Sequence, residues 1–232
     1  MPKDIPFEEF SRFALTADAV VFTILNNTLK VLLIRRKNPP FKGMYALPGG
    51  FLRTGETFEQ ACARELKEET NVSHIFLKKL SVYDKVDRDP RGRVITTAFT
   101  AIIDSHKVKL KADTDAITAE WFDAYKLPKL GFDHKDIIDE ALNDLRYEIQ
   151  ISNIAVQLLG NKFTLASLQK AYEVILDRKL DKRNFRKRIK ELDVLQPLKE
   201  TAMEGAHRPA QLHKFKNKRY TILKDKIHVF LK

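Results

Sequence analysis

The sequence contains a single cysteine, Cys62, among its 232 residues, and it has no long run of apolar residues. One cysteine excludes an internal disulfide and is typical of proteins that work inside the cell. No apolar stretch approaches the roughly 18 residues of a membrane-spanning helix, and the opening segment, MPKDIPFEEF, lacks the features of a signal peptide. We therefore expect a soluble, cytoplasmic protein with no membrane partner.

Charge is present in both signs but is unevenly distributed. Residues 1–150 carry 23 basic and 23 acidic side chains, whereas residues 151–232 carry 19 and 8. The net charge of +11 therefore lies in the last third of the chain. This asymmetry indicates either a basic solubilising tail or a domain that binds a polyanion. Hydrophobic residues make up 44% of the chain, which is enough for an ordinary core and excludes a disordered chain.

Acidic side chains are densest in residues 47–72, LPGGFLRTGETFEQACARELKEETNV. Residues 57–70 contain no glycine or proline, and Thr54 or Thr57 can cap a helix start, so we expect a helix there. Spacings of three and four place three carboxylates on one helix face: Glu65, Glu68 and Glu69. Neighbouring like charges destabilise a helix, so the pattern indicates either a solvated acidic surface or a site for a hard divalent cation.

The order of these residues resembles the Nudix box, a long and constrained pattern. The matching positions are Gly50, Glu56, Arg64, Glu65, Leu66, Glu68, Glu69 and Val72. One position departs, because Asn71 stands where the family pattern has its last glycine. Asparagine replaces glycine well in a left-handed helix C-cap, so we expect the turn to be kept.

The resemblance implies an α/β fold, the Nudix α/β/α sandwich, and a Mg²⁺ or Mn²⁺ ion held against a diphosphate. It implies that the metal ligands are Glu65, Glu68 and Glu69. It further implies that Glu68 and Glu69 are catalytic, with Arg64 orienting a glutamate through an ion pair. The backbone of Gly49 and Gly50 would approach the ligand. Metal charge would neutralise phosphate and activate water.

The other segments before residue 150 read as strands and one helix. Residues 14–24 and 29–36 form a predicted hairpin around Asn26-Asn27. Further strands are predicted at residues 45–47, 75–84, 94–103 and 118–123. Apolar residues at helical spacing then predict a closing helix over 133–150, which Asp133 can cap. The charged loop 86–93 offers three arginines that either contact a ligand phosphate or pair with Asp87 and Asp89: Arg88, Arg91 and Arg93.

We divide the chain into residues 1–152 and residues 153–232. In the second part, Thr164 can cap one helix and Asp181 a second. The second helix has an apolar face formed by Phe185, Ile189 and Leu192. Its other faces are basic or polar, with Arg183, Asn184, Arg186, Lys187 and Lys190. A helix, a turn and a basic helix indicate a helix-turn-helix.

Beyond the basic helix, the segment QLHKFKNKRYTIL predicts a hairpin that turns at Asn217-Lys218. A basic hairpin after a recognition helix favours a winged helix that binds duplex DNA. The alternative is a basic appendage for dimerisation or RNA contact. Expected DNA contacts are Arg183, Asn184, Arg186, Lys187 and Lys190 on the helix and Arg208, Lys214, Lys216 and Lys218 on the hairpin. Arg183, Asn184 and Lys187 are the expected base readers.

The order of the two parts resembles the Nudix-related transcriptional regulators. The resemblance also rests on four stretches: DRDPRGRV (87–94), LPKLGFDH (127–134), LDKRNFRKRI (180–189) and RPAQLHKF (208–215). It implies a homodimeric DNA-binding regulator that senses ADP-ribose or a related nucleotide or sugar metabolite. The alternative is a metal-dependent hydrolase of the ADP-ribose pyrophosphatase type. A weaker alternative is an RNA-associated Nudix protein, such as a decapping-type enzyme.

Overall fold

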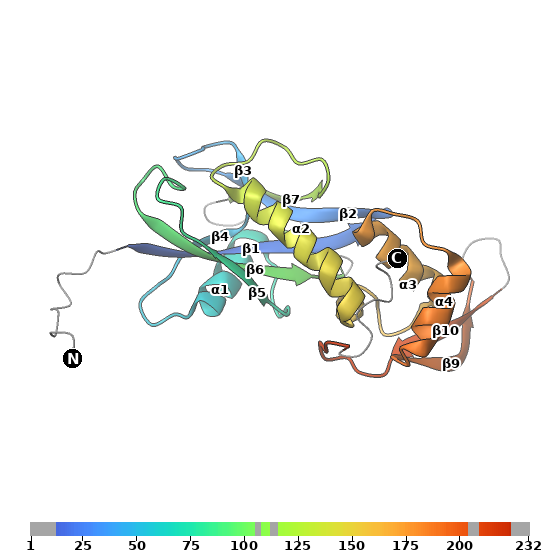
Figure 1. Ribbon diagram of the computed structural model, residues 1–232. Coiled ribbons are helices and arrows are strands. Elements are labelled where there is room, and N and C mark those ends of the chain that lie inside the picture. Colours follow the sequence, from blue (N-terminus) through green and yellow to red (C-terminus); the bar gives the residue numbers. More distant parts are fainter. Residues whose placement is uncertain (1–12, 105–107, 112–115, 204–208, 224–232) are drawn as a thin grey trace, which may run out of the picture.

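The computed structural model describes residues 13–104, 108–111, 116–203 and 209–223. Figure 1 shows a sheet flanked by helices, with a smaller group of helices and strands at one end. The elements are β1 (Ala14–Leu25), β2 (Thr28–Arg36), β3 (Tyr45–Ala46), β4 (Gly49–Phe51), α1 (Phe58–Thr70), β5 (Lys78–Tyr83), β6 (Val94–Ile102), β7 (Ala116–Asp123), α2 (His134–Ile151), η3 (Ile154–Gln157), β8 (Phe163–Thr164), α3 (Leu165–Leu176), α4 (Lys182–Glu191), β9 (Leu195–Ala202) and β10 (Ala210–Phe215). No helix in these described ranges is long and apolar enough to cross a membrane.

The larger part is the expected α/β/α sandwich. Its seven-stranded sheet has the order β3-β2-β1-β6-β5, with β4 paired to β1 and β7 paired to β2. The β1–β6 pair is parallel and the other pairs are antiparallel. The predicted hairpin of β1 and β2 is confirmed: Asn26 and Asn27 both have positive φ, which suits a tight two-residue turn.

Both faces of the central strand β1 are buried, and alternate residues enter different cores. Val20 and Phe22 join the cluster that contains the apolar face of α2. Ala19 and Val21 join the cluster that contains α1. Cys62 belongs to this second cluster and is 1% exposed, so it is a packed thiol as expected. The two helices therefore cover opposite faces of the sheet, which leaves the ends of its strands and their loops to form a site.

The smaller part is a winged helix, as predicted. Helices α3 and α4 pack on a three-stranded sheet of order β8-β10-β9. The expected caps are confirmed, because Thr164 accepts a hydrogen bond from Ser167 N and Asp181 accepts one from Asn184 N. Phe185 on α4 meets Tyr172 on α3 edge to face, with ring centroids 5.4 Å apart. This contact fixes the position of the basic helix.

The predicted wing hairpin is wrong in its strands. Strand β10 does not form a hairpin that turns at Asn217-Lys218. It pairs instead with β9, which precedes it in the chain, and with β8. The side chain of Asn217 accepts a hydrogen bond from Arg219 N and so shapes the segment that leaves the wing. Strand β9 escaped detection because its sequence, LQPLKETA, is largely exposed and shows no apolar alternation.

The segment after the wing returns to the end of α2. The side-chain amide of Asn153 donates to Asn217 O and Arg219 O, and its oxygen accepts from Thr221 N. Tyr220 Oη donates to Glu148 Oε2 at 2.6 Å. These contacts, together with one continuous apolar cluster from β1 to β10, attach the winged helix firmly to the sandwich. We call Glu148, Asn153, Tyr220 and Thr221 the junction.

Candidate functional site

Helix α1 presents the glutamates because its two ends are fixed by local hydrogen bonds. Thr57, and not Thr54, is the N-cap, and it forms a capping box with Gln60. Asn71 adopts the left-handed conformation at the C-terminus, with φ 63°, and its N–H donates to Lys67 O. The expected turn is thus kept without glycine. The Asn71 side chain adds a hydrogen bond to Lys109 O at 3.0 Å.

Arg64 is the centre of an ion-pair network. Its Nε and Nη2 donate to the two oxygens of Glu56 at 2.6 and 2.9 Å, and its Nη1 donates to Glu65 at 2.6 Å. The paired guanidinium lowers the pKa of Glu56 to about 2, so this carboxylate stays ionised. Arg64 also donates to Phe51 O at 3.0 Å. It therefore joins the helix to the glycine-containing strand β4 and holds Glu65 at the cavity wall.

Glu69 is the most buried member of the acidic group, at 5% exposure. It accepts a hydrogen bond from Gly49 N at 2.9 Å. Burial raises the pKa of Glu69 to about 8, and the nearby carboxylates of Glu65 and Asp18 act in the same direction. Buried carboxylates that lie close together repel one another, and a hard divalent cation, which prefers oxygen ligands, would offset this repulsion.

The three predicted ligands do not yet converge in the structure. Glu65 and Glu69 line the cavity, but Glu68 does not. Glu68 pairs with Arg53 at 3.3 Å and with Arg64 at 3.4 Å. Among the described residues, no three acidic, histidine or cysteine side chains are grouped as ligands of one ion. For all three glutamates to bind one cation, Glu68 must exchange its arginine partners for the metal.

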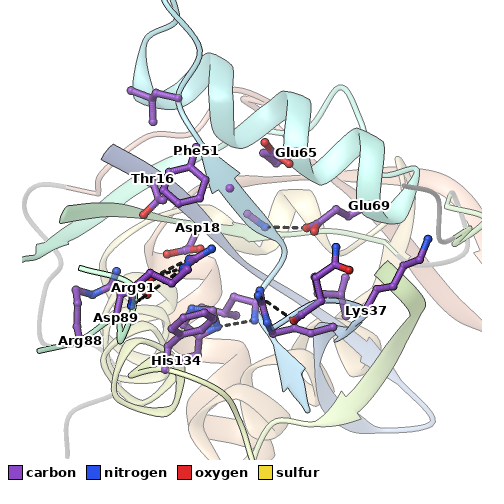
Figure 2. Close-up of a pocket in the computed structure, with 18 of the residues that line it drawn as sticks. Thr16, Asp18, Lys37, Phe51, Glu65, Glu69, Arg88, Asp89, Arg91 and His134 are labelled. Atoms are coloured by element: carbon purple, nitrogen blue, oxygen red, sulfur yellow. Dashed lines mark hydrogen bonds and ion pairs between the residues drawn. The ribbon is translucent and has the colours of Figure 1, made fainter. Parts of the chain in front are cut away.

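The cavity beside α1 has a volume of about 380 Å³ and lies at the ends of β1, β2 and β4 (Figure 2). One side is acidic, and other parts of the lining are basic or aromatic. The lining residues are Thr16, Asp18, Ile34, Arg36, Lys37, Asn38, Pro39, Leu47, Gly49, Gly50, Phe51, Leu52, Arg53, Glu65, Glu69, Arg88, Asp89, Arg91, Phe132 and His134. Its size and mixed lining suit a polar small molecule.

Two lining positions, Gly49 and Gly50, are closely approached by other groups, backbone at Gly49 and a side chain at Gly50. A Cβ at Gly50 would lie 2.6 Å from the Glu65 carboxylate, and one at Gly49 would lie 2.4 Å from Ala17 O. Both glycines pair with β1 in a short strand and line the cavity, and the resemblance implies that this backbone approaches the ligand. The backbone can therefore approach a ligand where a side chain would occupy the space.

The three arginines of the loop after β5 have different environments. Arg88 lines the cavity but is bound in a two-bond ion pair with Asp133 at 2.9 and 2.6 Å. Arg91 also lines the cavity, pairs with Asp89, and lies 5.0 Å from the Phe51 ring centroid. Arg93 does not line it, because its guanidinium donates to Asp84 O instead.

The prediction that Asp133 caps α2 through its side chain is wrong. Asp133 occupies the N-cap position, but its side chain makes no cap hydrogen bond. Both carboxylate oxygens of Asp133 accept hydrogen bonds from Arg88 instead. Arg88 is only 8% exposed, and a buried guanidinium needs a charged partner, so Asp133 serves that role and not the cap.

Several cavity residues were missed by the sequence analysis: Thr16, Asp18, Arg36, Phe132 and His134. Asp18 had a visible signal, because it is a single acidic residue within an otherwise apolar strand. Phe132 and His134 belong to the stretch LPKLGFDH, which was recognised only as a family feature. Phe132 has φ 56°, a conformation that is uncommon for a bulky residue and that marks functional loops.

Helix α4 has the predicted arrangement of faces. Phe185 and Ile189 are 1% and 3% exposed, and Leu192, which follows the helix, is also buried. The predicted contacts on the helix are all exposed: Arg183, Asn184, Arg186, Lys187 and Lys190. They form a second candidate site, a mainly basic group of side chains on α4, which lies at one end of the molecule in Figure 1.

The predicted wing contacts are less uniform. Lys214 lies on β10 and is half-buried. Lys216 pairs with Asp193 at 2.7 Å, and Lys218 donates to Asn161 Oδ1 at 2.9 Å. Arg208 lies outside the described residues. Lys216 and Lys218 are exposed, so their ammonium groups remain accessible to a polyanion.

Comparisons with known proteins match both parts of the chain. Residues 15–141 match the model for the NUDIX domain, and residues 155–215 match the model for the NrtR DNA-binding winged helix domain. The ADPR responsive transcriptional repressor NtrR of Acinetobacter baylyi is 33% identical over 207 residues, which cover 87% of this chain and 81% of the relative. An ADP-ribose pyrophosphatase of Methanocaldococcus jannaschii is 52% identical over 117 residues, which cover 50% of this chain and 68% of that protein.

A solved structure covers nearly the whole molecule. The crystal structure of Shewanella oneidensis NrtR complexed with a 27mer DNA superimposes with a TM-score of 0.76 at 33% identity. The match covers 87% of this chain and 93% of that chain. Its extent includes both the sandwich and the winged helix, in the same order. The chain therefore belongs to the Nudix-related transcriptional regulators, the NrtR family.

Proposed function

We propose that the protein is a DNA-binding transcriptional regulator whose Nudix domain senses ADP-ribose or a closely related metabolite. The observation that carries the proposal is that a polar cavity and an exposed basic helix belong to one continuously packed body. The similarity to an ADPR responsive repressor over 87% of this chain supports the same function.

ADP-ribose suits the chemistry of the cavity. Its diphosphate would lie against Gly49 and Gly50, with Mg²⁺ or Mn²⁺ held by Glu65 and Glu69 and joined by Glu68. The cation would neutralise phosphate charge beside these carboxylates. Arg91 offers a further positive charge at the cavity wall. Arg88 serves mainly to hold Asp133 in place, because its Nε and Nη2 donate to that carboxylate.

DNA binding is assigned to α4 and the wing. A homodimer would place two α4 helices in successive major grooves, roughly 34 Å apart, on a palindromic operator. Arg183 and Asn184 suit guanine and adenine edges respectively, and Lys187 lies one turn further along the same helix. Lys214, Lys216 and Lys218 suit phosphate contacts, which set position and affinity but not sequence.

The junction supplies a physical connection between the two sites. Tyr220 and Thr221 follow the wing, and they bind Glu148 and Asn153 at the end of α2. The first residue of α2, His134, lines the cavity. One helix thus touches the ligand site at its start and the DNA-binding part at its end. By linkage, ADP-ribose changes DNA affinity only if it binds the two states of the dimer unequally.

The test is fluorescence anisotropy with duplex DNA from the upstream region of the protein's own gene, titrated with ADP-ribose. We expect specific, salt-sensitive binding that ADP-ribose alters. Arg183→Ala should weaken it by about 1–3 kcal/mol, whereas Lys135→Ala on the exposed side of α2 should have no effect. Absence of sequence-specific binding would overturn the proposal.

Hydrolysis of ADP-ribose is a second candidate function. It is favoured by the 52% identity to an ADP-ribose pyrophosphatase and by the complete set of box carboxylates. Glu68→Gln and Glu69→Gln should each abolish any magnesium-dependent release of AMP, because both remove a metal ligand. AMP release that survives both changes would exclude the acidic group as the catalytic site.

A further inference from the structure

His134 is a buried residue that lines the cavity, and its Nε2 atom has no hydrogen-bond partner among the described residues. It is 5% exposed and is the first residue of α2. Its Nδ1 accepts the N–H of Leu47 at 2.8 Å, so the neutral ring carries its proton on Nε2. Burial lowers the pKa of His134, which favours this neutral form. Among the described residues, none accepts a hydrogen bond from Nε2.

Asp18 supplies a complementary acceptor on the same cavity wall. It is 6% exposed, and its Oδ2 accepts a hydrogen bond from Thr96 Oγ1 at 2.7 Å. No described residue donates to Oδ1. The absence of a side chain at Gly49 leaves this oxygen uncovered, because a Cβ there would lie 2.4 Å from it. In the view of Figure 2, Asp18 lies between Glu65 and His134.

We propose that Asp18 and His134 together bind a sugar hydroxyl of the ligand. The hydroxyl would accept from His134 Nε2 and donate to Asp18 Oδ1, which satisfies both buried groups at once. A phosphate fits this pair poorly, since it would place negative charge against a carboxylate while gaining only a neutral donor. The pair therefore binds a sugar in preference to the diphosphate. The diphosphate would instead lie against Gly49 and Gly50, beside the cation.

The inference rests on the proposed function and specifies which end of ADP-ribose enters first. Asp18 and His134 are both buried, whereas Phe51, which lines the same cavity, is 44% exposed. The exposed ring suits the flat adenine base near the entrance. The ribose beyond the diphosphate then reaches the buried pair. The cavity thus selects a nucleoside diphosphate that carries a terminal sugar over one that ends in phosphate.

The experiment compares ADP-ribose with ADP by titration calorimetry on the full-length chain, with Ca²⁺ in place of Mg²⁺ so that a hard cation is present, and AMP is assayed in parallel to detect any turnover. His134→Asn keeps an acceptor for Leu47 N but removes the Nε2 donor. His134→Gln is the matched variant, because it restores an N–H near Nε2 and gives up the Leu47 bond. Asp18→Asn is a third variant, which keeps an acceptor for Thr96 and tests the other half of the pair.

We expect the wild type to prefer ADP-ribose over ADP. His134→Asn and Asp18→Asn should each reduce this preference about tenfold while ADP affinity stays the same, and His134→Gln should keep more of it. The inference is overturned if the wild type shows no preference, or if each variant weakens both nucleotides equally. If the wild type binds neither nucleotide, the proposed ligand itself is wrong, and that result appears before any variant is made.

Discussion

The replacement Tyr220→Phe tests whether the junction holds the winged helix on the sandwich. Tyr220 Oη donates to Glu148 Oε2 at 2.6 Å, and the Tyr220 ring stacks on Phe76 with centroids 5.4 Å apart. Glu148 is 8% exposed at its side chain, and its other oxygen is bound by Lys78 Nζ at 2.7 Å. Phenylalanine keeps the stacked ring and removes only the hydroxyl, so the change removes the Glu148 hydrogen bond together with the weaker interaction with Ser152.

The expected loss follows from the charge and burial of Glu148. A hydrogen bond to a charged group contributes about 1.5–3 kcal/mol, and a buried oxygen left without a donor is costly. Lys78 stays in place and partly compensates, because it pairs with Asp144 as well as with Glu148. We therefore expect Tyr220→Phe to lower the free energy of unfolding by about 2 kcal/mol.

The assay is urea denaturation, with ligand-dependent DNA binding as its functional counterpart. Tyr147→Phe is the matched control. Tyr147 lies on α2 beside Glu148, is 50% exposed and has no hydrogen-bond partner among the described residues. It should change stability by less than about 0.5 kcal/mol. Tyr220→Phe should also reduce the effect of ADP-ribose on DNA affinity. A stability equal to that of the control would refute the assigned role of the junction.

Three further predictions concern α1 and its neighbours. The pKa of Glu69 is about 8 in the folded chain against an ordinary 4.5, so between these pH values the unfolded chain releases a proton that the folded chain keeps, and the free energy of unfolding falls as pH rises. Between about pH 6 and about pH 9, the free energy of unfolding of Glu69→Gln should therefore rise by about 3 kcal/mol relative to that of the wild type. The assay is urea denaturation without metal, and parallel pH curves for the two proteins would contradict the prediction. Asn71→Ala should cost about 1–2 kcal/mol in the same assay, and Asn71→Gly clearly less, because only alanine is strained at positive φ. Gly50→Ala should displace the Glu65 carboxylate and weaken Mg²⁺ binding about tenfold, with little loss of stability since a flexible side chain gives way; Gly160→Ala, which meets nothing within 4 Å, is the control, and equal calorimetric affinities would refute the argument.

The parts that the sequence predicted well are those determined by neighbours along the chain. Helix α1 followed from a cap at Thr54 or Thr57, which the structure resolves to Thr57, together with an uninterrupted helical stretch and a residue that tolerates the left-handed turn at Asn71. The faces of α4 followed from the spacing of Phe185 and Ile189, which are buried as expected. In both cases the information lies within about four turns of helix, where periodicity is a reliable physical signal.

The parts that the sequence did not predict depend on contacts between distant segments. Asp18 and His134 line one cavity although 115 residues separate them, and no local pattern links them. Asp133 was expected to cap α2, but its carboxylate is bound by Arg88 from another loop. The partner of β10 was predicted wrongly. The turn residues Asn217-Lys218 suggested pairing with the segment that follows them, whereas β10 pairs with the preceding strand β9 because of how the wing packs as a whole.

The proposed division at residues 152 and 153 falls at the end of α2, yet the apolar core does not stop there. Val20, Ile138 and Phe185 belong to one buried cluster. Tyr125 Oη, from the sandwich, donates to Val174 O and Ile175 O in the last turn of α3 at 3.1 Å each. A winged helix held in this way cannot swing about a flexible linker without exposing apolar surface. In the proposed homodimer, ligand binding would therefore act on DNA affinity through small movements of a nearly rigid protomer, which change the spacing of the two α4 helices.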